Sequence, residues 1–596
     1  MWPALPRSGG SRSARSRRRA ARTAASAWSL RVRPMRIAGR QFVRRAARFD
    51  TVEQTVSLDL AALGMGVVQT EDFIVYRTGE EVRIYDRVCD HNGGRLITNG
   101  GAVSCPLHGW RFDPRSGAYE NAAARKKPVF QAFADNMPAV VELARKSSRR
   151  GLQGYGERRG TSLRFLNHAC VVVETGGIRF ATDPWIFGPA FCNGWWLAWP
   201  SPQDSMQVLN NCDFIYISHN HPDHLHPETL SDVRRDMPIL TPDFATGSTL
   251  RYLRDLGFGE IHSMGFDEVW ADEAGQIALS CLKSGDFRDD SGLLLESGEF
   301  TALFGVDSNY IDFWRFPERL TVLANSFAGG ASGFPLCFEN YTEAEKRRIV
   351  TRNRNAVRAT NRMMLEIARP DFFLPYAGFF KERAERDAFI AERNNKNAIA
   401  DFAENCAGVD CEILDVTKAQ IFRFDGDRLV SSLADQADSL PVDDIAQYLK
   451  DSLQSYGNVD ENLIRDYFLR SKFQRDLDFE LIVTTDDFSR PLASFNIHFR
   501  EGDDPLILTA GDGIAPRRHD VRYKQIRVRA AELMKVIRQG LPWEDLSIGF
   551  QCRVYREPNV YNADFWYHFS NVYVNDAVKT RTQDCAGCAI LEQRVF

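Results

Sequence analysis

One short stretch, residues 214–226, constrains the fold and the chemistry of this chain more than any other. It opens with four β-favouring residues, which predict a buried strand that ends in a turn and the start of a helix. The strand leads into five side chains that can bind metal: His219, His221, Asp223, His224 and His226. The chain contains 11 His, and four of them lie within residues 219–226, so a chance polar loop is a poor explanation. Imidazoles and a carboxylate are the usual ligands of zinc and non-haem iron.

The spacing of the motif separates its members. Residues two apart at the end of a strand can point to the same side, so His219 and His221 can share one ion. Asp223 and His224 fall on the turn, where they can hold a second ion or support the first ligands from behind. His226 is expected to be a bystander.

A second group of metal-binding residues precedes the first. Cys89 and His91 form one loop, and Cys105 and His108 form another, with 13 residues between the two loops. One cysteine and one histidine per loop is the ligand set of a Rieske [2Fe–2S] centre, in which two thiolates hold one iron and two imidazoles hold the other. A zinc site is the alternative, but zinc sites usually space the ligands as paired cysteines and paired histidines. The sequence from His108 to Asp113 also resembles the second ligand loop of Rieske oxygenases and their ferredoxins.

The chain around the first motif resembles the metallo-β-lactamase fold. A hairpin-like pair of strands over 162–183 ends in Asp183-Pro184 and precedes the 214–226 stretch, and His168 lies in a His-Ala turn, where it is either a ligand or a structural histidine. The resemblance implies further ligands at later strand ends, for which Asp286 and Asp307 are the candidates. No His lies between His262 and His498, so the full histidine set of a two-zinc hydrolase is missing. Two His and one carboxylate match non-haem Fe(II) oxygenases.

A Rieske cluster and a mononuclear iron in one chain predict a monooxygenase, because the iron needs electrons to activate O2. Short segments then narrow the resemblance to the CMP-N-acetylneuraminate hydroxylase family; they lie at 188–191, 194–196, 326–335, 376–379 and 394–397. The family implies a nucleotide-sugar substrate, CMP-N-acetylneuraminate, whose N-acetyl group becomes N-glycolyl. It also implies O2 and electrons from NADH through cytochrome b5 and its reductase, with a ferredoxin as another possible donor.

Length and pattern predict a multidomain α/β protein. We expect a disordered Arg-rich head at 1–50, an all-β Rieske [2Fe–2S] domain at 51–145 and a metallo-β-lactamase-like αββα sandwich at 155–404. A C-terminal α+β domain should span 405–596. In finer detail, we expect a basic linker at 145–154, a helix at 345–369, strands at 478–485 and 494–499, and a helix at 523–539.

Charge and composition exclude several classes of protein. Residues 1–50 hold 14 Arg and one acid, a net charge of +13, which leaves −17 for the rest of the chain and argues against a nucleic-acid-binding surface there. The head has the composition of a transit peptide, but Met35 could also be the true start. No apolar run is long enough for a transmembrane helix. Twelve scattered Cys favour a reducing compartment, and we expect a cytoplasmic protein that could form oligomers.

Two other functions remain open. A metal hydrolase, such as a lactonase or phosphodiesterase, would use zinc and Asp223 as general base, with the Rieske domain as a redox module. A scaffold or electron-transfer protein would keep the cluster and have an inactive site in its β-lactamase-like domain. Metal content separates the three functions, because an oxygenase holds about three iron per chain and a hydrolase about two iron plus zinc.

Overall fold

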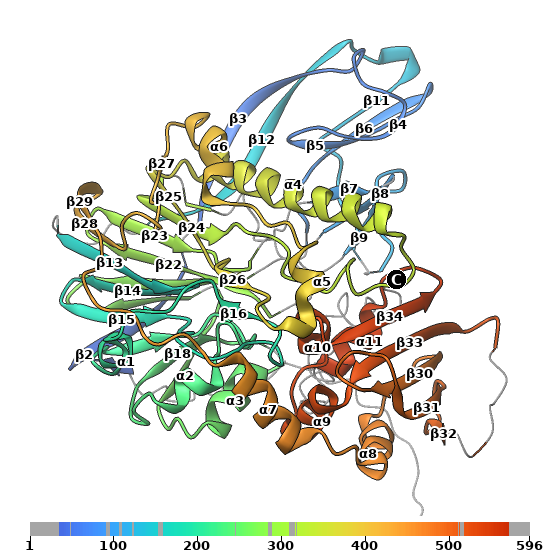
Figure 1. The fold of residues 1–596 in the computed structure, drawn as a ribbon. Helices are drawn as coiled ribbons and strands as arrows, with labels where there is room; N and C mark the ends of the chain where they lie inside the picture. Colours follow the sequence, from blue (N-terminus) through green and yellow to red (C-terminus); the bar gives the residue numbers. More distant parts are fainter. Residues whose placement is uncertain are drawn as a thin grey trace, which may run out of the picture.

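The computed structural model describes most of the chain between residues 35 and 570 (Figure 1). The described residues are 35–37, 39–47, 49–90, 96–99, 101–105, 110–121, 124–152, 159–244, 246–266, 268–283, 289–308, 316–317, 319–509, 512 and 518–570. Within these ranges, no helix has both the length and the apolar composition needed to span a bilayer.

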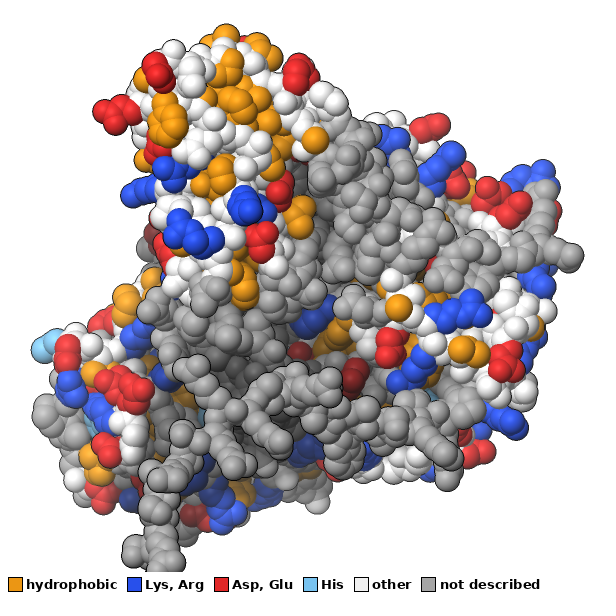
Figure 2. Space-filling view, turned by 180° about the vertical axis from the view of Figure 1, so that it is seen from behind, with side chains coloured by type: hydrophobic (Ala, Val, Ile, Leu, Met, Phe, Trp, Pro, Cys, Tyr) orange, Lys and Arg blue, Asp and Glu red, His pale blue; other side chains and the backbone are white. Residues whose placement is uncertain are grey.

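The described residues of the N-terminal lobe form strands, together with one short 3-10 helix at Ala134–Asn136. One four-stranded sheet has the order β11-β6-β5-β4, with bounds Phe130–Phe133, Glu81–Asp86, Phe73–Arg77 and Gly66–Gln69. A smaller sheet, β10-β9-β8-β7, comprises Ala118–Tyr119, Arg111–Asp113, Ala102–Ser104 and Ile97–Asn99. A long antiparallel ribbon of β3 (Phe49–Asp59) and β12 (Val140–Arg150) joins the lobe to the rest of the molecule. Seen from behind, the lobe projects outward and carries a concentration of hydrophobic side chains (Figure 2).

The central domain consists of two large sheets. The eight-stranded sheet has the order β19-β18-β17-β15-β14-β13-β28-β29, with bounds Ile261–Met264, Ile239–Pro242, Phe214–Tyr216, Ile178–Thr182, Cys170–Thr175, Gly160–Asn167, Ile421–Asp425 and Arg428–Leu433. The nine-stranded sheet has the order β1-β2-β20-β21-β22-β23-β24-β25-β27, with bounds Met35–Ile37, Arg40–Ala46, Glu268–Asp272, Ala278–Lys283, Ser291–Ser297, Phe300–Phe304, Val322–Ser326, Phe372–Tyr376 and Glu412–Ile413. A small ribbon pairs β16 (Trp196–Leu197) with β26 (Phe380–Lys381).

Successive side chains along a strand point to opposite faces of the eight-stranded sheet, and both faces are buried. In β17, Phe214 and Tyr216 face the core between the sheets, whereas Ile215 faces a second core beneath the helices. The helices over this outer face are α1 (Ser205–Asn210), α2 (Pro227–Ser231) and α3 (Ser248–Asp255). Helix α4 (Glu343–Ala368) covers the nine-stranded sheet through residues such as Met364 and Leu365. The predicted αββα sandwich is therefore confirmed.

Helix α4 begins and ends at local signals. Its N-cap Thr342 and Glu345 form a reciprocal capping box, which satisfies exposed backbone N–H groups. It ends at Arg369, whose left-handed backbone precedes Pro370. The helix predicted at 345–369 is thus present. Short helices follow at α5 (Ala388–Ala391) and α6 (Ala403–Ala407), with 3-10 turns at Glu385–Asp387 and Ile399–Phe402.

The C-terminal domain is an α+β unit around the sheet β32-β31-β30-β33-β34. The strands span Leu506–Thr509, Pro491–Phe499, Leu477–Thr484, Arg522–Arg529 and Cys552–Glu557, and the helices α7 to α11 span Ile445–Tyr456, Glu461–Ser471, Ala530–Gln539, Glu544–Ile548 and Ala563–Ser570. The strands predicted at 478–485 and 494–499 are present. The helix predicted at 523–539 is wrong in its first half, because residues 522–529 form β33.

The strand pairings also bear on the domain boundaries. Residues 35–37 and 40–46, assigned from sequence to a disordered head, form β1 and β2; β1 pairs with β2, and β2 pairs with β20. Ile37 and Phe42 enter the core, while Arg40 pairs with Asp272 at 3.3 Å. Strand β12 continues to Arg150, through part of the predicted linker at 145–154. Residues 412–433, placed by the sequence in the third domain, belong to the central sheets. We therefore propose that the central domain includes 35–46 and extends to about residue 433.

Candidate functional site

Side chains that can bind metal converge where the parallel strands of both central sheets end. Strand β15 runs parallel to β17, and their carboxyl ends deliver Asp183 and His219. In the other sheet, β23 runs parallel to β24, and Asp307 follows the end of β23. The carboxyl ends of parallel strands are where α/β folds usually build binding sites.

Two sets of three residues can each hold one metal ion. The first set is His168, Asp223 and His224, all buried. One Asp223 carboxylate oxygen lies 3.1 Å from His168 Nε2 and 3.3 Å from His224 Nε2. His168 lies in a left-handed turn with φ of 44°, so this residue is both the turn histidine and a candidate ligand.

The second set is His219, His221 and Asp307. His219 Nε2 and His221 Nδ1 lie 2.8 Å apart, a separation that brings both nitrogens to one position. Asp307 Oδ2 lies 3.7 Å from His224 Nε2, so this carboxylate lies between the two sets. The structure therefore brings together His219, His221, Asp223, His224 and Asp307, as the sequence predicts.

Asp183 orients the ligands from behind. Its carboxylate accepts hydrogen bonds from the Ser218 N–H and hydroxyl, both at 2.7 Å, and its Oδ2 lies 3.1 Å from His224 Nδ1. The Ser218 hydroxyl in turn contacts His219 Nδ1 at 2.9 Å. With both Nδ1 atoms engaged in this way, the Nε2 atoms of His219 and His224 face the metal positions.

The atoms of the first set fit a bound cation. His224 Nε2 and Asp223 Oδ1 are buried without a hydrogen-bond partner among the described residues. Burial alone would raise the pKa of Asp223, but the neighbouring His224 and His168 imidazoles hold it well below its ordinary value. A buried carboxylate that stays ionised beside imidazole nitrogens is the donor chemistry of zinc and non-haem iron sites.

The remaining predicted residues have different outcomes. His226 is a bystander, as expected: its Nδ1 accepts the Thr229 N–H at the start of α2, and burial lowers its pKa to about 4. Asp286 lies outside the described residues. Asp290, which the sequence did not single out, is buried with Oδ1 3.8 Å from His219 Nε2.

The C-terminal domain contributes a further acid that the sequence did not reveal. Glu544 Oε1 lies 3.4 Å from His221 Nε2. Burial disfavours a charged His221, but Glu544, together with Asp290 and Asp223, more than offsets this effect and raises the pKa of His221 to about 9. No local signal in the sequence marks Glu544, because it lies 323 positions after His221.

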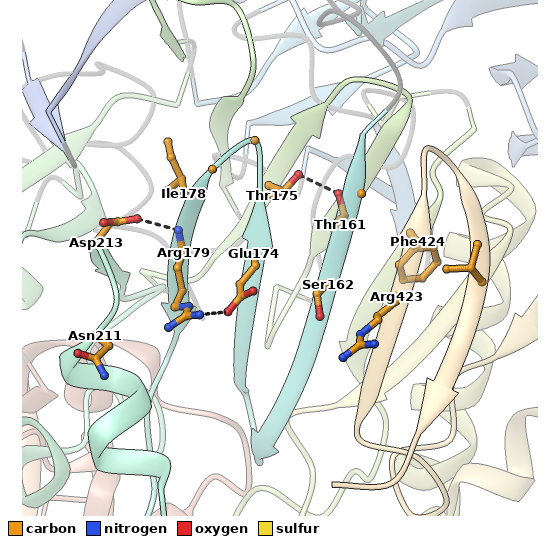
Figure 3. A pocket seen from close by; sticks show the side chains of 14 residues that line it. Thr161, Ser162, Glu174, Thr175, Ile178, Arg179, Asn211, Asp213, Arg423 and Phe424 are labelled. Carbon is orange, nitrogen blue, oxygen red and sulfur yellow. Dashed lines mark hydrogen bonds and ion pairs between the residues drawn. The ribbon is translucent and has the colours of Figure 1, made fainter.

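A cavity of about 250 Å³ opens beside the second set. His221, Asp290 and Asp307 line its metal side, and Phe191, Trp195 and Phe380 are among its aromatic walls. A larger hollow of about 620 Å³ lies open on the surface over β13, β14 and β15 (Figure 3). It contains no His or Cys among the described residues, and its Arg179 is paired with Glu174. The enclosed cavity is therefore the candidate reaction site.

The N-terminal lobe contains a separate candidate metal site. Cys89 and Cys105 are buried in one apolar cluster, whereas His91 and His108 lie outside the described residues. Each ligand loop is closed at its base by a backbone hydrogen bond, Leu96 N–H to Arg87 O at 2.7 Å and Cys105 N–H to Trp110 O at 2.8 Å. Two thiols buried together at the bases of closed loops fit the cysteine half of a Rieske cluster.

Comparisons with known proteins agree with this arrangement. Residues 53–138 match the Rieske [2Fe–2S] domain, and residues 162–281 match the beta-lactamase superfamily domain. A cytidine monophosphate-N-acetylneuraminic acid hydroxylase of Danio rerio is 30% identical over 539 residues, which cover 83% of this chain and 88% of that protein. The chain belongs to the CMP-N-acetylneuraminic acid hydroxylase family. The Xenopus laevis member of the family is 29% identical and covers 84% of this chain and 88% of its own length.

Membership of the hydroxylase family confirms the resemblance predicted from short segments, together with the order of the Rieske and β-lactamase-like domains. The Rieske match supports a [2Fe–2S] cluster, and the two ligand sets support a metal site in the central domain. Among solved structures, CmlA, a diiron β-hydroxylase from Streptomyces venezuelae, is 18% identical with a TM-score of 0.29. The match covers 47% of this chain and 55% of the CmlA chain.

Proposed function

We propose that this chain is a Rieske-dependent monooxygenase that hydroxylates the N-acetyl group of CMP-N-acetylneuraminate to give CMP-N-glycolylneuraminate. The observation that carries the proposal is the presence of both metal motifs in a chain that aligns over more than four-fifths of its length with hydroxylases of that name. O2 is the oxygen source. We propose cytochrome b5 or a ferredoxin, with an NADH-dependent reductase, as the electron donor.

The residues divide between two groups. Cys89, Cys105, His91 and His108 would hold the [2Fe–2S] cluster. His219, His221 and Asp307 would hold a mononuclear non-haem Fe(II), with zinc as the alternative metal. When bound, the cluster supplies single electrons and the iron supplies O2 activation.

The cavity suits the acyl end of the substrate. Phe191, Trp195 and Phe380 form apolar walls, while Asn353 adds an amide group. No Lys or Arg is present among the described residues that line the cavity. The uncharged N-acetyl group therefore fits beside His221 and Asp307, and the phosphate and carboxylate of the substrate would lie outside.

The histidine set disfavours the rival hydrolase, because no His lies between His262 and His498 and the full set of a two-zinc hydrolase is therefore missing. We also favour a reducing compartment such as the cytoplasm, since the ten cysteines of the described residues form no disulfide.

Metal analysis and an activity assay test the proposal together. Anaerobically purified protein should contain about three iron and two acid-labile sulfides per chain. With CMP-N-acetylneuraminate, O2 and a reductase system it should form the N-glycolyl product. His219→Ala should abolish product and leave the Rieske absorption intact, whereas His262→Ala, on β19, should change neither. Two iron plus zinc, with hydrolysis of esters or phosphodiesters and no hydroxylation, would replace the proposal with the hydrolase.

A further inference from the structure

Helix α10 of the C-terminal domain packs against the central domain beside the candidate metal site. Ile548 lines the cavity, and its carbonyl accepts a hydrogen bond from Trp195 Nε1 at 3.1 Å. A methyl group added at Gly194 would overlap the Gly549 carbonyl, and one added at Gly333 would overlap the Ser547 carbonyl. Only a residue without a side chain permits such approaches, so the backbone holds α10 against two loops of the central domain.

This placement brings Glu544 to one side of His221. The Nδ1 atom of His221 lies 2.8 Å from His219 Nε2, on the side of the second ligand set. Its Nε2 atom points the other way and lies 3.4 Å from Glu544 Oε1. The two nitrogens of one ring therefore face different partners, a candidate metal position and a carboxylate.

We propose that Glu544 is a positioning residue that holds the His221 imidazole with its proton on Nε2 and its Nδ1 free for the metal. A metal-binding histidine commonly donates its second N–H to a carboxylate, which fixes the tautomer and ring orientation and makes the ligand more basic. Here the carboxylate comes from another domain, so the affinity of the central domain for its metal depends on the docked C-terminal domain. The inference rests on the metal site of the proposed function and adds this domain to it.

Glu544 is not required to hold the two domains together. Buried ion pairs elsewhere in the interface join Arg529 to Asp387 at 2.7 Å and Arg386 to Glu532 at 2.8 Å. Glu339 of the central domain also pairs with Arg527 of β33. A change at Glu339 therefore alters a carboxylate at the same interface without touching His221, and provides a matched control for Glu544.

Cobalt binding to the full-length protein tests the inference. The metal site of the central domain is emptied with a chelator under conditions that keep the Rieske absorption. Its Co²⁺ affinity is then measured by competition with a chromophoric chelator. Glu544→Ala should weaken Co²⁺ binding about 10- to 100-fold and change the visible Co²⁺ spectrum. Glu544→Gln, which keeps an acceptor oxygen, should recover part of the affinity, and Glu339→Gln should behave as wild type.

The outcomes distinguish the inference from the proposed function. Wild-type affinity and spectrum in Glu544→Ala would overturn the inference and leave the hydroxylase intact. Equal losses in Glu544→Ala and Glu339→Gln would also overturn it, because domain docking alone would then explain the effect. A selective loss in Glu544→Ala supports it, even if wild-type protein forms no N-glycolyl product, because Co²⁺ binding is measured without substrate.

Discussion

Replacing Asp183 by Asn tests whether one buried carboxylate supports both ligand sets. Oδ1 accepts the Ser218 N–H, whereas Oδ2 accepts the Ser218 hydroxyl and faces His224 Nδ1. An asparagine oxygen can replace only one of these atoms. Its NH2 group would meet one donor in the place of Oδ1 and two donors in the place of Oδ2. Each hydrogen bond to a charged group contributes about 1.5–3 kcal/mol, so the substitution costs about 1.5–6 kcal/mol, depending on the orientation of the amide.

Part of that loss should be observed as weaker metal binding. Without the charged acceptor, His224 is held less firmly in one tautomer, and so is His219 through the Ser218 hydroxyl. Loss of one outer carboxylate typically lowers metal affinity 10- to 100-fold. Chelator competition and thermal unfolding of Asp183→Asn should therefore show both effects.

The matched control is Asp213→Asn. Asp213 precedes β17 at the end opposite to the ligands, and its carboxylate accepts the Arg179 N–H at 2.8 Å. This variant should keep wild-type metal affinity. Wild-type affinity and thermal stability in Asp183→Asn would refute the assigned role of Asp183.

Three further predictions concern other parts of the chain. Cys105→Ser should remove the Rieske absorption and NADH-driven turnover, while metal binding in the central domain persists. Continued turnover would make the cluster dispensable. Gly549→Ala should lower stability by about 1–3 kcal/mol, since its methyl group would overlap the Phe191 carbonyl, whereas Gly259→Ala, with open space around it, should not; equal melting temperatures would contradict this close approach. Burial, helped by Arg556, lowers the pKa of Lys524 to about 7, so the unfolded state binds more protons between pH 7 and 10.5 and stability should rise with pH by up to about 1.4 kcal/mol per unit. Lys524→Met should flatten that slope in urea unfolding, and an unchanged slope would place the titration elsewhere.

The ligand motif could be predicted from the sequence because its chemistry is local. A strand, a turn and a helix start deliver His219 to His224 in one continuous segment. The side chains of β17 are all buried and alternate between two cores. Local signals also mark α4, whose capping residues are adjacent to it in sequence. Asp290 and Glu544 could not be found in this way, since only tertiary packing brings them to the histidines.

Two errors have a common physical cause, a basic side chain in a strand. The many arginines of residues 35–46 hide the apolar Ile37 and Phe42. In β33, Lys524 occupies a buried position between Phe565 and Trp566, which breaks the apolar alternation with Ile526 and Val528. A long cationic side chain can cover apolar surface, so composition alone misassigns such strands.

The position of α10 also has a consequence for biosynthesis. A ribosome completes the last central strand at Leu433 and then adds 110 residues before it reaches Glu544. At about 5–20 residues per second, the nascent central domain waits on the order of 5–20 s for this carboxylate. His221 would meet cellular metal ions during that interval without its outer partner, so tight loading of the site should follow translation of α10.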